Sequence, residues 1–169
     1  TFLLVAMTFI NSMTERNVFE ALRCWLVSQG FTFRKIFWIT GILSFFISPI
    51  ADNLTTALIM CAVVMAVGKN NSKFIGLACI NIVVCANAGG AFSPFGDITT
   101  LMVWQKGVVS FSQFFYIFVP SVVNALIPAA IMHFAISNDK PAASKEKVTV
   151  KRGGYTIIGL FLGTITFTV

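Results

Sequence analysis

Two aspartates stand alone in long uncharged stretches of the chain, each inside a repeated motif. The first motif is Ser48-Pro49-Ile50-Ala51-Asp52-Asn53-Leu54-Thr55-Thr56, and the second is Ser93-Pro94-Phe95-Gly96-Asp97-Ile98-Thr99-Thr100. Asp52 is the only acidic or basic residue between 36 and 68, and Asp97 is the only one between 74 and 105. A carboxylate in hydrocarbon costs several kcal/mol, so such a residue normally belongs to an ion or proton pathway.

The side chains around the two acids are oxygen ligands. Carboxylates are hard ligands that suit sodium or lithium better than soft donors do. Asn53 and Asn87 add amide oxygens, and hydroxyls come from Thr55, Thr56, Thr99 and Thr100. Proline and glycine beside each acid are expected to break the helix and free carbonyls that can coordinate a cation. The pattern predicts one site built from two discontinuous segments, at which a proton and a cation compete for the same carboxylates.

The same residues also have structural uses. Aspartate at a helix N-terminus caps the first turn and interacts favourably with the helix dipole. The threonines follow the acids closely, where their hydroxyls can cap backbone amides as readily as they can coordinate an ion. For the acids the functional interpretation is favoured, because Ser or Asn would cap without placing a charge in an apolar segment.

The composition is that of a membrane protein. Hydrophobic residues make up 57% of the chain and charged residues only 11%. The surplus of 12 Lys and Arg over 6 Asp and Glu does not form a basic stripe with aromatics, so a bilayer rather than a nucleic acid is the expected partner. Four cysteines lack metal-site spacing and are interpreted as small hydrophobic residues: Cys24, Cys61, Cys79 and Cys85. No cofactor is expected besides the transported ions.

Residues 34–68 are predicted to form a re-entrant helical hairpin. The apolar stretch is expected to break near Ser48-Pro49, leaving halves of roughly 20 Å, too short for a hydrocarbon core of about 30 Å. Basic residues flank both ends, Arg34 and Lys35 before and Lys69 and Lys73 after, which places both ends in the cytoplasm. The alternative is one tilted span with a proline kink.

The remaining segments complete an all-α membrane protein. Residues 74–105 are predicted as a broken transmembrane helix that is unwound over 87–97, because three glycines and a proline disfavour regular helix there. Residues 108–137 are predicted as a transmembrane helix kinked at Pro120 and Pro128. The other expectations are the end of a transmembrane helix over 1–14, an interfacial amphipathic helix over 15–33, a basic cytoplasmic loop over 138–154 and a truncated transmembrane helix over 155–169. Both chain ends fall inside apolar runs, so the chain is expected to be a fragment.

The two motifs resemble the signatures of NhaD-type sodium/proton antiporters. The similarity runs from the first motif through residues 87–105 and covers most of 15–137. It implies the ion transporter superfamily, with two inverted repeats, each holding a re-entrant hairpin and a broken helix, and elevator-like alternating access. The chain would be the first-repeat half, with the second repeat in the remainder of its own chain and a homodimer as a candidate assembly. Carried over by position, the functional residues are Ser48, Asp52, Asn53, Thr55, Asn87, Asp97, Thr99 and Thr100, with Asp52 and Asp97 holding transported sodium or lithium.

The resemblance predicts a secondary active antiporter rather than an enzyme, in a bacterial inner membrane or, as the alternative, a plastid envelope. The nearest rival is a related permease for dicarboxylate, citrate or arsenite, but Asp52 and Asp97 would repel a carboxylate substrate. A distant rival is an intramembrane aspartyl protease, whose Gly-x-Gly-Asp motif is matched only partly because Pro94 replaces the first glycine. His133 is open to either pH sensing or packing.

Overall fold

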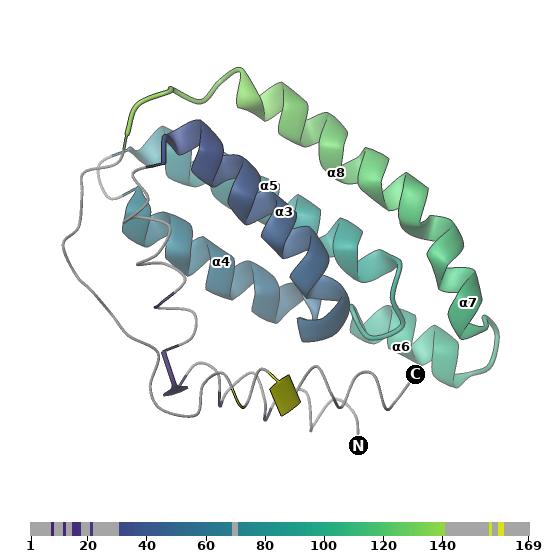
Figure 1. Cartoon of the computed structure of the whole chain (residues 1–169). Coiled ribbons are helices and arrows are strands. Elements are labelled where there is room, and N and C mark those ends of the chain that lie inside the picture. The colour runs from purple at the N-terminus through teal and green to yellow at the C-terminus, as the bar shows by residue number, and fades with distance from the viewer. Residues whose placement is uncertain are drawn as a thin grey trace. The chain divides into compact units, whose positions relative to one another are not determined.

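The computed structural model describes residues 31–68 and 71–140, together with isolated residues nearer the two ends. The chain divides into two compact units, and the unit Phe31–Pro141 contains the helices described below. The predictions for 1–14 and 155–169, and most of those for 15–33 and 138–154, lie outside the described residues. In the described part every regular element is helical (Figure 1): α3 (Phe33–Ala51), α4 (Asn53–Val67), α5 (Ser72–Ala91), α6 (Ile98–Gln105), α7 (Phe111–Phe114), a 3-10 turn η1 (Phe115–Ile117) and α8 (Phe118–His133).

Three of the helical stretches are long and apolar enough, by length and composition, to cross a membrane. They are Phe33–Ala51, Ser72–Ala91 and Phe111–His133, with 19, 20 and 23 residues. At 1.5 Å per residue these correspond to about 28 to 35 Å, which matches a hydrocarbon core of about 30 Å. The described part is therefore the all-helical membrane architecture that the composition predicts.

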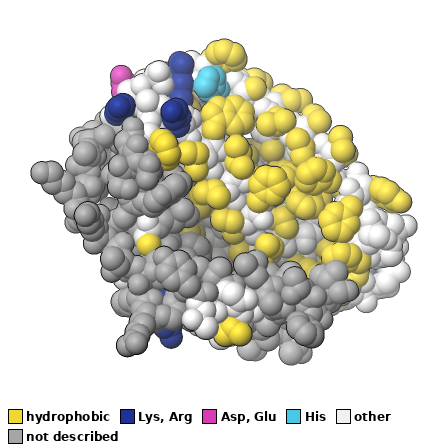
Figure 2. All heavy atoms as spheres, viewed as in Figure 1, with side chains coloured by type: hydrophobic (Ala, Val, Ile, Leu, Met, Phe, Trp, Pro, Cys, Tyr) yellow, Lys and Arg dark blue, Asp and Glu magenta, His cyan; other side chains and the backbone are white. Residues whose placement is uncertain are grey.

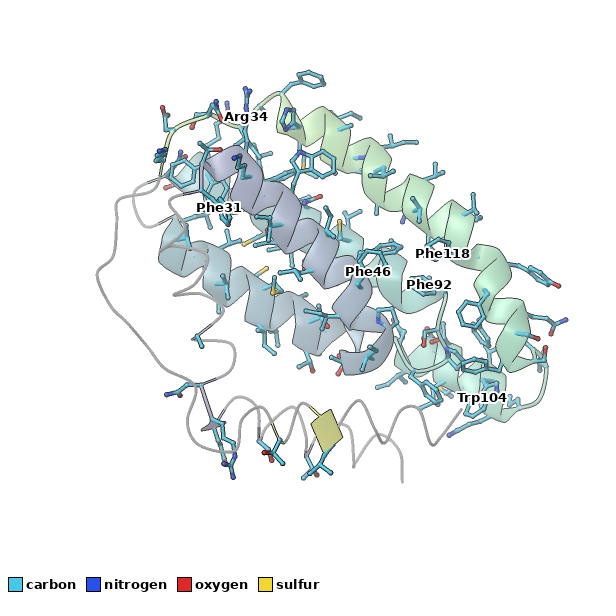
Figure 3. The ribbon with its side chains drawn as sticks, viewed as in Figure 1. Phe31, Arg34, Phe46, Phe92, Trp104 and Phe118 are labelled. Atoms are coloured by element: carbon cyan, nitrogen blue, oxygen red, sulfur yellow. The ribbon has the colours of Figure 1, made fainter. Side chains whose placement is uncertain are left out.

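Helix α5 is the centre of this unit, since it packs against α3, α4 and α8. Its buried positions include Ala78, Ala86, Ala88 and Gly89, and small residues of this kind let membrane helices approach closely. Larger side chains fill the remaining space, and the rings of Phe45 and Phe92 lie 5.4 Å apart between centroids. Phe92 in turn packs edge-on against Phe118 of α8 at 5.1 Å (Figure 3).

The chain reverses direction at Asp52, so that α4 runs back alongside α3 (Figure 1). The rings of Phe33 and Phe74 lie 4.5 Å apart, which brings the start of α3 next to the start of α5. At the same end, the indole of Trp38 donates a hydrogen bond to His133 Nδ1 near the end of α8, at 3.0 Å. The segment 34–68 therefore begins and ends at the same end of the unit.

The positions of the helix interruptions differ from the sequence predictions. Helix α3 continues through Pro49 to Ala51 and is longer than the half-helix expected, because the chain breaks at Asp52 rather than near Ser48-Pro49. Helix α5 stays regular through Gly89 and Gly90 to Ala91, so only 92–97 are irregular and not the whole of 87–97. These glycines serve close packing rather than unwinding, as their contacts show below.

The proline kinks expected in 108–137 also take a different form. Helix α8 runs without interruption through Pro128. The irregularity comes earlier, at η1, where the helix tightens to a 3-10 turn just before Pro120. A proline has no N–H to donate to the carbonyl of the preceding turn, so that turn need not keep α-helical geometry.

Candidate functional site

The first interruption is a single residue, Asp52, in a backbone conformation that is unusual for a side-chain-bearing residue. Its φ is 57° and its ψ is 157°, close to a region populated almost only by glycine. Holding a non-glycine residue there costs on the order of 1–3 kcal/mol. Asp52 Oδ1 accepts a hydrogen bond from the Thr55 amide at 2.8 Å, and Oδ2 accepts one from the Thr55 hydroxyl at 2.7 Å. The carboxylate thus caps α4 with both of its oxygens.

The second interruption ends at Asp97, which caps α6 with one oxygen only. Asp97 Oδ1 accepts hydrogen bonds from the Thr99 amide at 2.8 Å and the Thr99 hydroxyl at 2.9 Å. The Thr100 hydroxyl instead donates to the backbone carbonyl of Asp97, also at 2.8 Å. This leaves Asp97 Oδ2 directed away from its own helix.

Asparagine side chains join the two interruptions. The Asn53 amide Nδ2 donates to Asp97 Oδ2 at 2.6 Å and to Asn87 Oδ1 at 2.8 Å. The Asn87 amide donates in turn to the Val83 carbonyl one turn back in α5, at 2.9 Å, which directs its Oδ1 toward Asn53. Three polar side chains from α4, α5 and the start of α6 therefore converge at one point, and we call these residues, Asn53, Asn87 and Asp97, the asparagine–aspartate cluster.

The serine that begins each motif helps to dock the α3–α4 reversal against α5 and the second interruption. Ser48 of the first motif is buried and donates to the Ala86 carbonyl in α5 at 2.6 Å. Ser93 of the second motif donates to the Pro49 carbonyl at 2.9 Å. A backbone hydrogen bond of 2.9 Å from the Asn53 amide to the Gly96 carbonyl adds a third link. Each copy of the repeated motif therefore contributes one serine hydrogen bond to the packing of these segments.

Glycines make this docking possible. Pro49 has no N–H, so the Phe45 carbonyl lacks its usual donor in α3. The backbone of Gly89 approaches this carbonyl so closely that a Cβ at Gly89 would clash with it. A Cβ at Gly90 would stand 2.7 Å from the Gly96 carbonyl, in the second interruption. Larger residues at either position would push the interruptions apart.

The residues predicted for the site fall into three groups. Asn53, Asn87 and Asp97 are in direct contact, with Thr99 attached to the far side of Asp97. Asp52 and Thr55 form their own pair, and among the described residues no hydrogen bond joins its side chains to the cluster. Ser48 and Thr100 bond to backbone carbonyls and support the fold. The prediction that both acids can cap helices is therefore confirmed, since Asp52 caps α4 and Asp97 caps α6.

One buried polar residue near the site was named among the candidate hydroxyls but was not carried over by position as a functional residue. Thr56 is only 1% exposed, and its hydroxyl has no hydrogen-bond partner among the described residues. A buried hydroxyl left unpaired costs about 1–3 kcal/mol. The sequence shows two adjacent threonines in each motif, but it does not show which of the two is buried, because that depends on which face of the helix packs against its neighbours.

The charge around the site is negative and is not balanced locally. Asp52 and Asp97 are both half-buried, and the stretches 36–68 and 74–105 contain no Lys, Arg or His. In the described part of the chain no three His, Cys, Asp or Glu residues gather as a metal centre. The available side chains are two carboxylates supplemented by amide, hydroxyl and backbone oxygens, which are hard ligands and do not suit a soft transition metal.

Membrane-length helices packed around two capped interruptions, joined by the asparagine–aspartate cluster, define the class, an integral membrane protein. Over residues 1–169 the chain matches the CitMHS family, described as citrate transporters, and it belongs to that family. No solved structure matches the chain.

Within this family, the chain is most usefully compared with curated relatives that are named as sodium/proton antiporters. The chain is 62% identical to the "Na(+)/H(+) antiporter NhaD" of Vibrio cholerae and 60% identical to that of Alkalimonas amylolytica, in each case over 97% of the chain and 34% of the relative. It is also 62% identical to the protein of that name from Vibrio parahaemolyticus, over 97% of the chain and 40% of the relative. The resemblance to NhaD-type antiporters predicted from the motifs is confirmed. The chain spans about a third of the length of the relatives it matches.

Proposed function

We propose that the protein containing this chain exchanges sodium or lithium for protons across a membrane, as a secondary active antiporter and not an enzyme. The observation that carries the proposal is the convergence of Asp97 Oδ2 and Asn87 Oδ1 on one point, occupied by the Asn53 amide. The names of the curated relatives support the same activity. No cofactor is required, because the cation and the proton are themselves the cargo.

The chemistry of the cluster explains how two cargoes can share it. The Asn53 amide group presents partial positive charge to two oxygens, as a sodium ion would. Rotation of this amide would replace its N–H groups with its carbonyl oxygen, which gives three oxygen ligands on one cation. A proton on Asp97 would remove the negative charge that attracts the ion, so proton and cation binding oppose each other. Asp52, with Thr55, is the second carboxylate of the proposed site.

The arrangement in the membrane is part of the proposal. We assign 34–68 as a re-entrant hairpin and 74–105 as a broken transmembrane helix, with both acids inside the bilayer. Basic residues favour the cytoplasmic side, and Arg34, Lys35 and Lys73 all belong to the end at which α3 and α5 start. We assign the protein to a bacterial inner membrane, with a second inverted repeat from the rest of its chain completing the transport path and with a homodimer as the candidate assembly.

Citrate is the second candidate substrate, because the family is described by citrate transport. A tricarboxylate needs basic residues or bound cations to offset its charge. The described segments around the cluster offer two carboxylates and no basic side chain between 36 and 68 or between 74 and 105. Charge therefore favours a cation as the cargo that contacts these residues.

The test is transport in membrane vesicles by full-length protein. Asp52→Asn and Asp97→Asn keep the size of the side chain but remove its charge, so each should abolish sodium-dependent proton movement with protein levels near normal. Asp139→Asn is the matched control, since Asp139 is exposed and lies outside the motifs; it should retain exchange. Near wild-type exchange in either motif variant would remove that residue from the site. Uptake of labelled citrate without sodium-dependent proton movement would instead establish the second candidate.

A further inference from the structure

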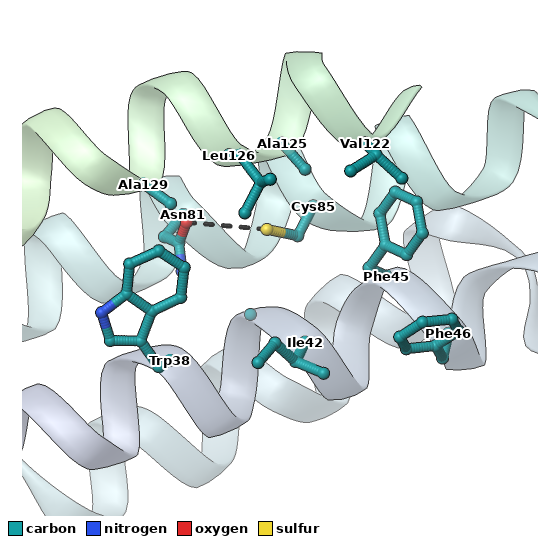
Figure 4. A pocket seen from close by; sticks show the side chains of 11 residues that line it. Trp38, Ile42, Phe45, Phe46, Asn81, Cys85, Val122, Ala125, Leu126 and Ala129 are labelled. Atoms are coloured by element: carbon teal, nitrogen blue, oxygen red, sulfur yellow. Dashed lines mark hydrogen bonds between the residues drawn. The ribbon is translucent and has the colours of Figure 1, made fainter. Parts of the chain in front are cut away.

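An apolar groove runs between α3 and α8, over α5, away from the two interruptions. Its volume is about 130 Å³, and its walls include Trp38, Ile42 and Phe46 from α3 and Val122, Leu126 and Ala129 from α8 (Figure 4). The groove opens outward, because Ile42 is 50% exposed, Phe46 is 58% exposed and Leu126 is 49% exposed. The space-filling view shows hydrophobic side chains gathered on this face of the described part, with basic side chains and a histidine along its upper edge (Figure 2).

One end of the groove carries positive charge. Arg34 precedes Trp38 by one helical turn and so lies on the same face of α3, above the apolar wall (Figure 3). The Arg34 Nε–H donates to the Ile136 carbonyl at 2.8 Å, which fixes the side chain across the α3–α8 boundary. That contact uses one of the five guanidinium N–H donors. Lys35 and Lys140 are exposed at the same end, and Asp139 is the one acid at that end among residues 31–68 and 71–140.

Trp38 lies between the charged end and the apolar part of the groove. Its ring forms part of the groove wall, while its Nε1–H is directed at His133 Nδ1, 3.0 Å away on α8. Tryptophan is enriched at the level of lipid headgroups, where one part of the side chain is apolar and the other polar. One face of α3 thus carries a stripe of side chains that begins with a basic residue, continues with tryptophan and ends with apolar residues: Arg34, Trp38, Ile42 and Phe46.

We propose that this groove is a binding site for a phospholipid with an anionic headgroup. The headgroup phosphate binds Arg34 and Lys35, and part of one acyl chain lies in the groove between α3 and α8. Basic pockets between membrane helices on the cytoplasmic side suit anionic headgroups, and that leaflet is the one rich in anionic lipid. The proposal rests on the proposed membrane arrangement, in which the end with Arg34 is cytoplasmic, and not on which ion is transported.

The test uses purified full-length protein in neutral detergent, with thermal unfolding measured as lipid is added. Phosphatidylglycerol should raise the unfolding temperature more than phosphatidylcholine of the same chain length. Arg34→Gln and Lys35→Gln should each weaken the apparent phosphatidylglycerol affinity about fivefold. Lys106→Gln is the matched control, because Lys106 is exposed but follows α6, far along the chain from this stripe, and it should keep the wild-type affinity.

A second variant tests the groove itself. Ala129→Leu should fill the α8 side of the groove and weaken binding of the intact lipid, counted by native mass spectrometry. Glycerol phosphate and inorganic phosphate should give no stabilisation, since they lack the chain. Equal effects of the two lipids, equal loss in Lys106→Gln, or full stabilisation by inorganic phosphate would each overturn the proposal. So would an Ala129→Leu protein that binds lipid normally but changes from dimer to monomer, since a second copy would then occupy the groove.

Discussion

Each of the two acids works as a helix cap, and this does not compete with a role in ion binding. A carboxylate has about four lone-pair positions, and the caps use only some of them. Asp97 directs Oδ1 to Thr99 and Oδ2 to the asparagine–aspartate cluster, so that one side chain joins its helix and the site. The strained backbone at Asp52 also supports a role for its carboxylate beyond capping, because glycine would fit that conformation better and could also begin a helix.

Asp52→Gly separates these roles at the level of one residue. Loss of the cap to glycine costs only a few tenths of a kcal/mol, and relief of the positive φ offsets this by on the order of 1 kcal/mol. We therefore expect thermal stability to stay near the wild-type value while sodium-dependent proton movement is lost. Retained exchange in a stable Asp52→Gly protein would mean that the residue is structural and that its carboxylate has no part in transport.

At the scale of the helices, the two interruptions behave as one docked unit. The Ser48, Ser93 and Gly96 contacts tie the tip of the α3–α4 reversal to α5 and to the segment before α6. The close approach of Gly89 to the Phe45 carbonyl places the proline of α3 against the small face of α5. Because these contacts surround the cluster, the spacing of Asn53 and Asp97 depends on how closely the helices pack.

Gly89→Ala tests this dependence. The added Cβ would clash with the Phe45 carbonyl, and forced separation of packed helices typically costs about 1–3 kcal/mol. We expect lower thermal stability together with weaker apparent sodium affinity. Gly76→Ala is the control within the same helix, since a Cβ there meets nothing within 4 Å and alanine favours helix by about 1 kcal/mol. If Gly89→Ala kept both properties, close docking would not be needed for the site.

The orientation of the α3–α4 reversal in the membrane can be tested by cysteine labelling. In a protein lacking its native cysteines, single cysteines at Lys35 and Lys73 should react from the same side, the cytoplasm. The reason is that α3 and α5 start side by side, with Phe33 and Phe74 in contact. A cysteine at Lys106 should react from the opposite side. If Lys35 and Lys73 were labelled from different sides, the re-entrant assignment would be discarded.

For the whole molecule, the sequence was sufficient to predict an all-helical membrane architecture in the described part of the chain. The isolated charges at Asp52 and Asp97 identified the two interruptions, and hydropathy identified the membrane-length helices. The exact ends of the helices were not predictable in the same way. Pro49 and Gly89 disfavour helix locally, but tertiary packing between α3 and α5 keeps both residues helical. The asparagine bridge required the relative placement of three segments, which spacing along the chain does not give.

The central claim is that protons and sodium compete for the same carboxylates, and apparent sodium affinity as a function of pH tests it most directly. The measurement uses everted vesicles containing the full-length protein, from about pH 7 to about pH 9.5, with proton movement driven by added sodium. Competition predicts that the apparent sodium affinity strengthens as pH rises, because fewer protons are then available to occupy the shared site. An apparent sodium affinity that stays constant across this range would contradict the shared site and would require separate sites for the proton and the cation.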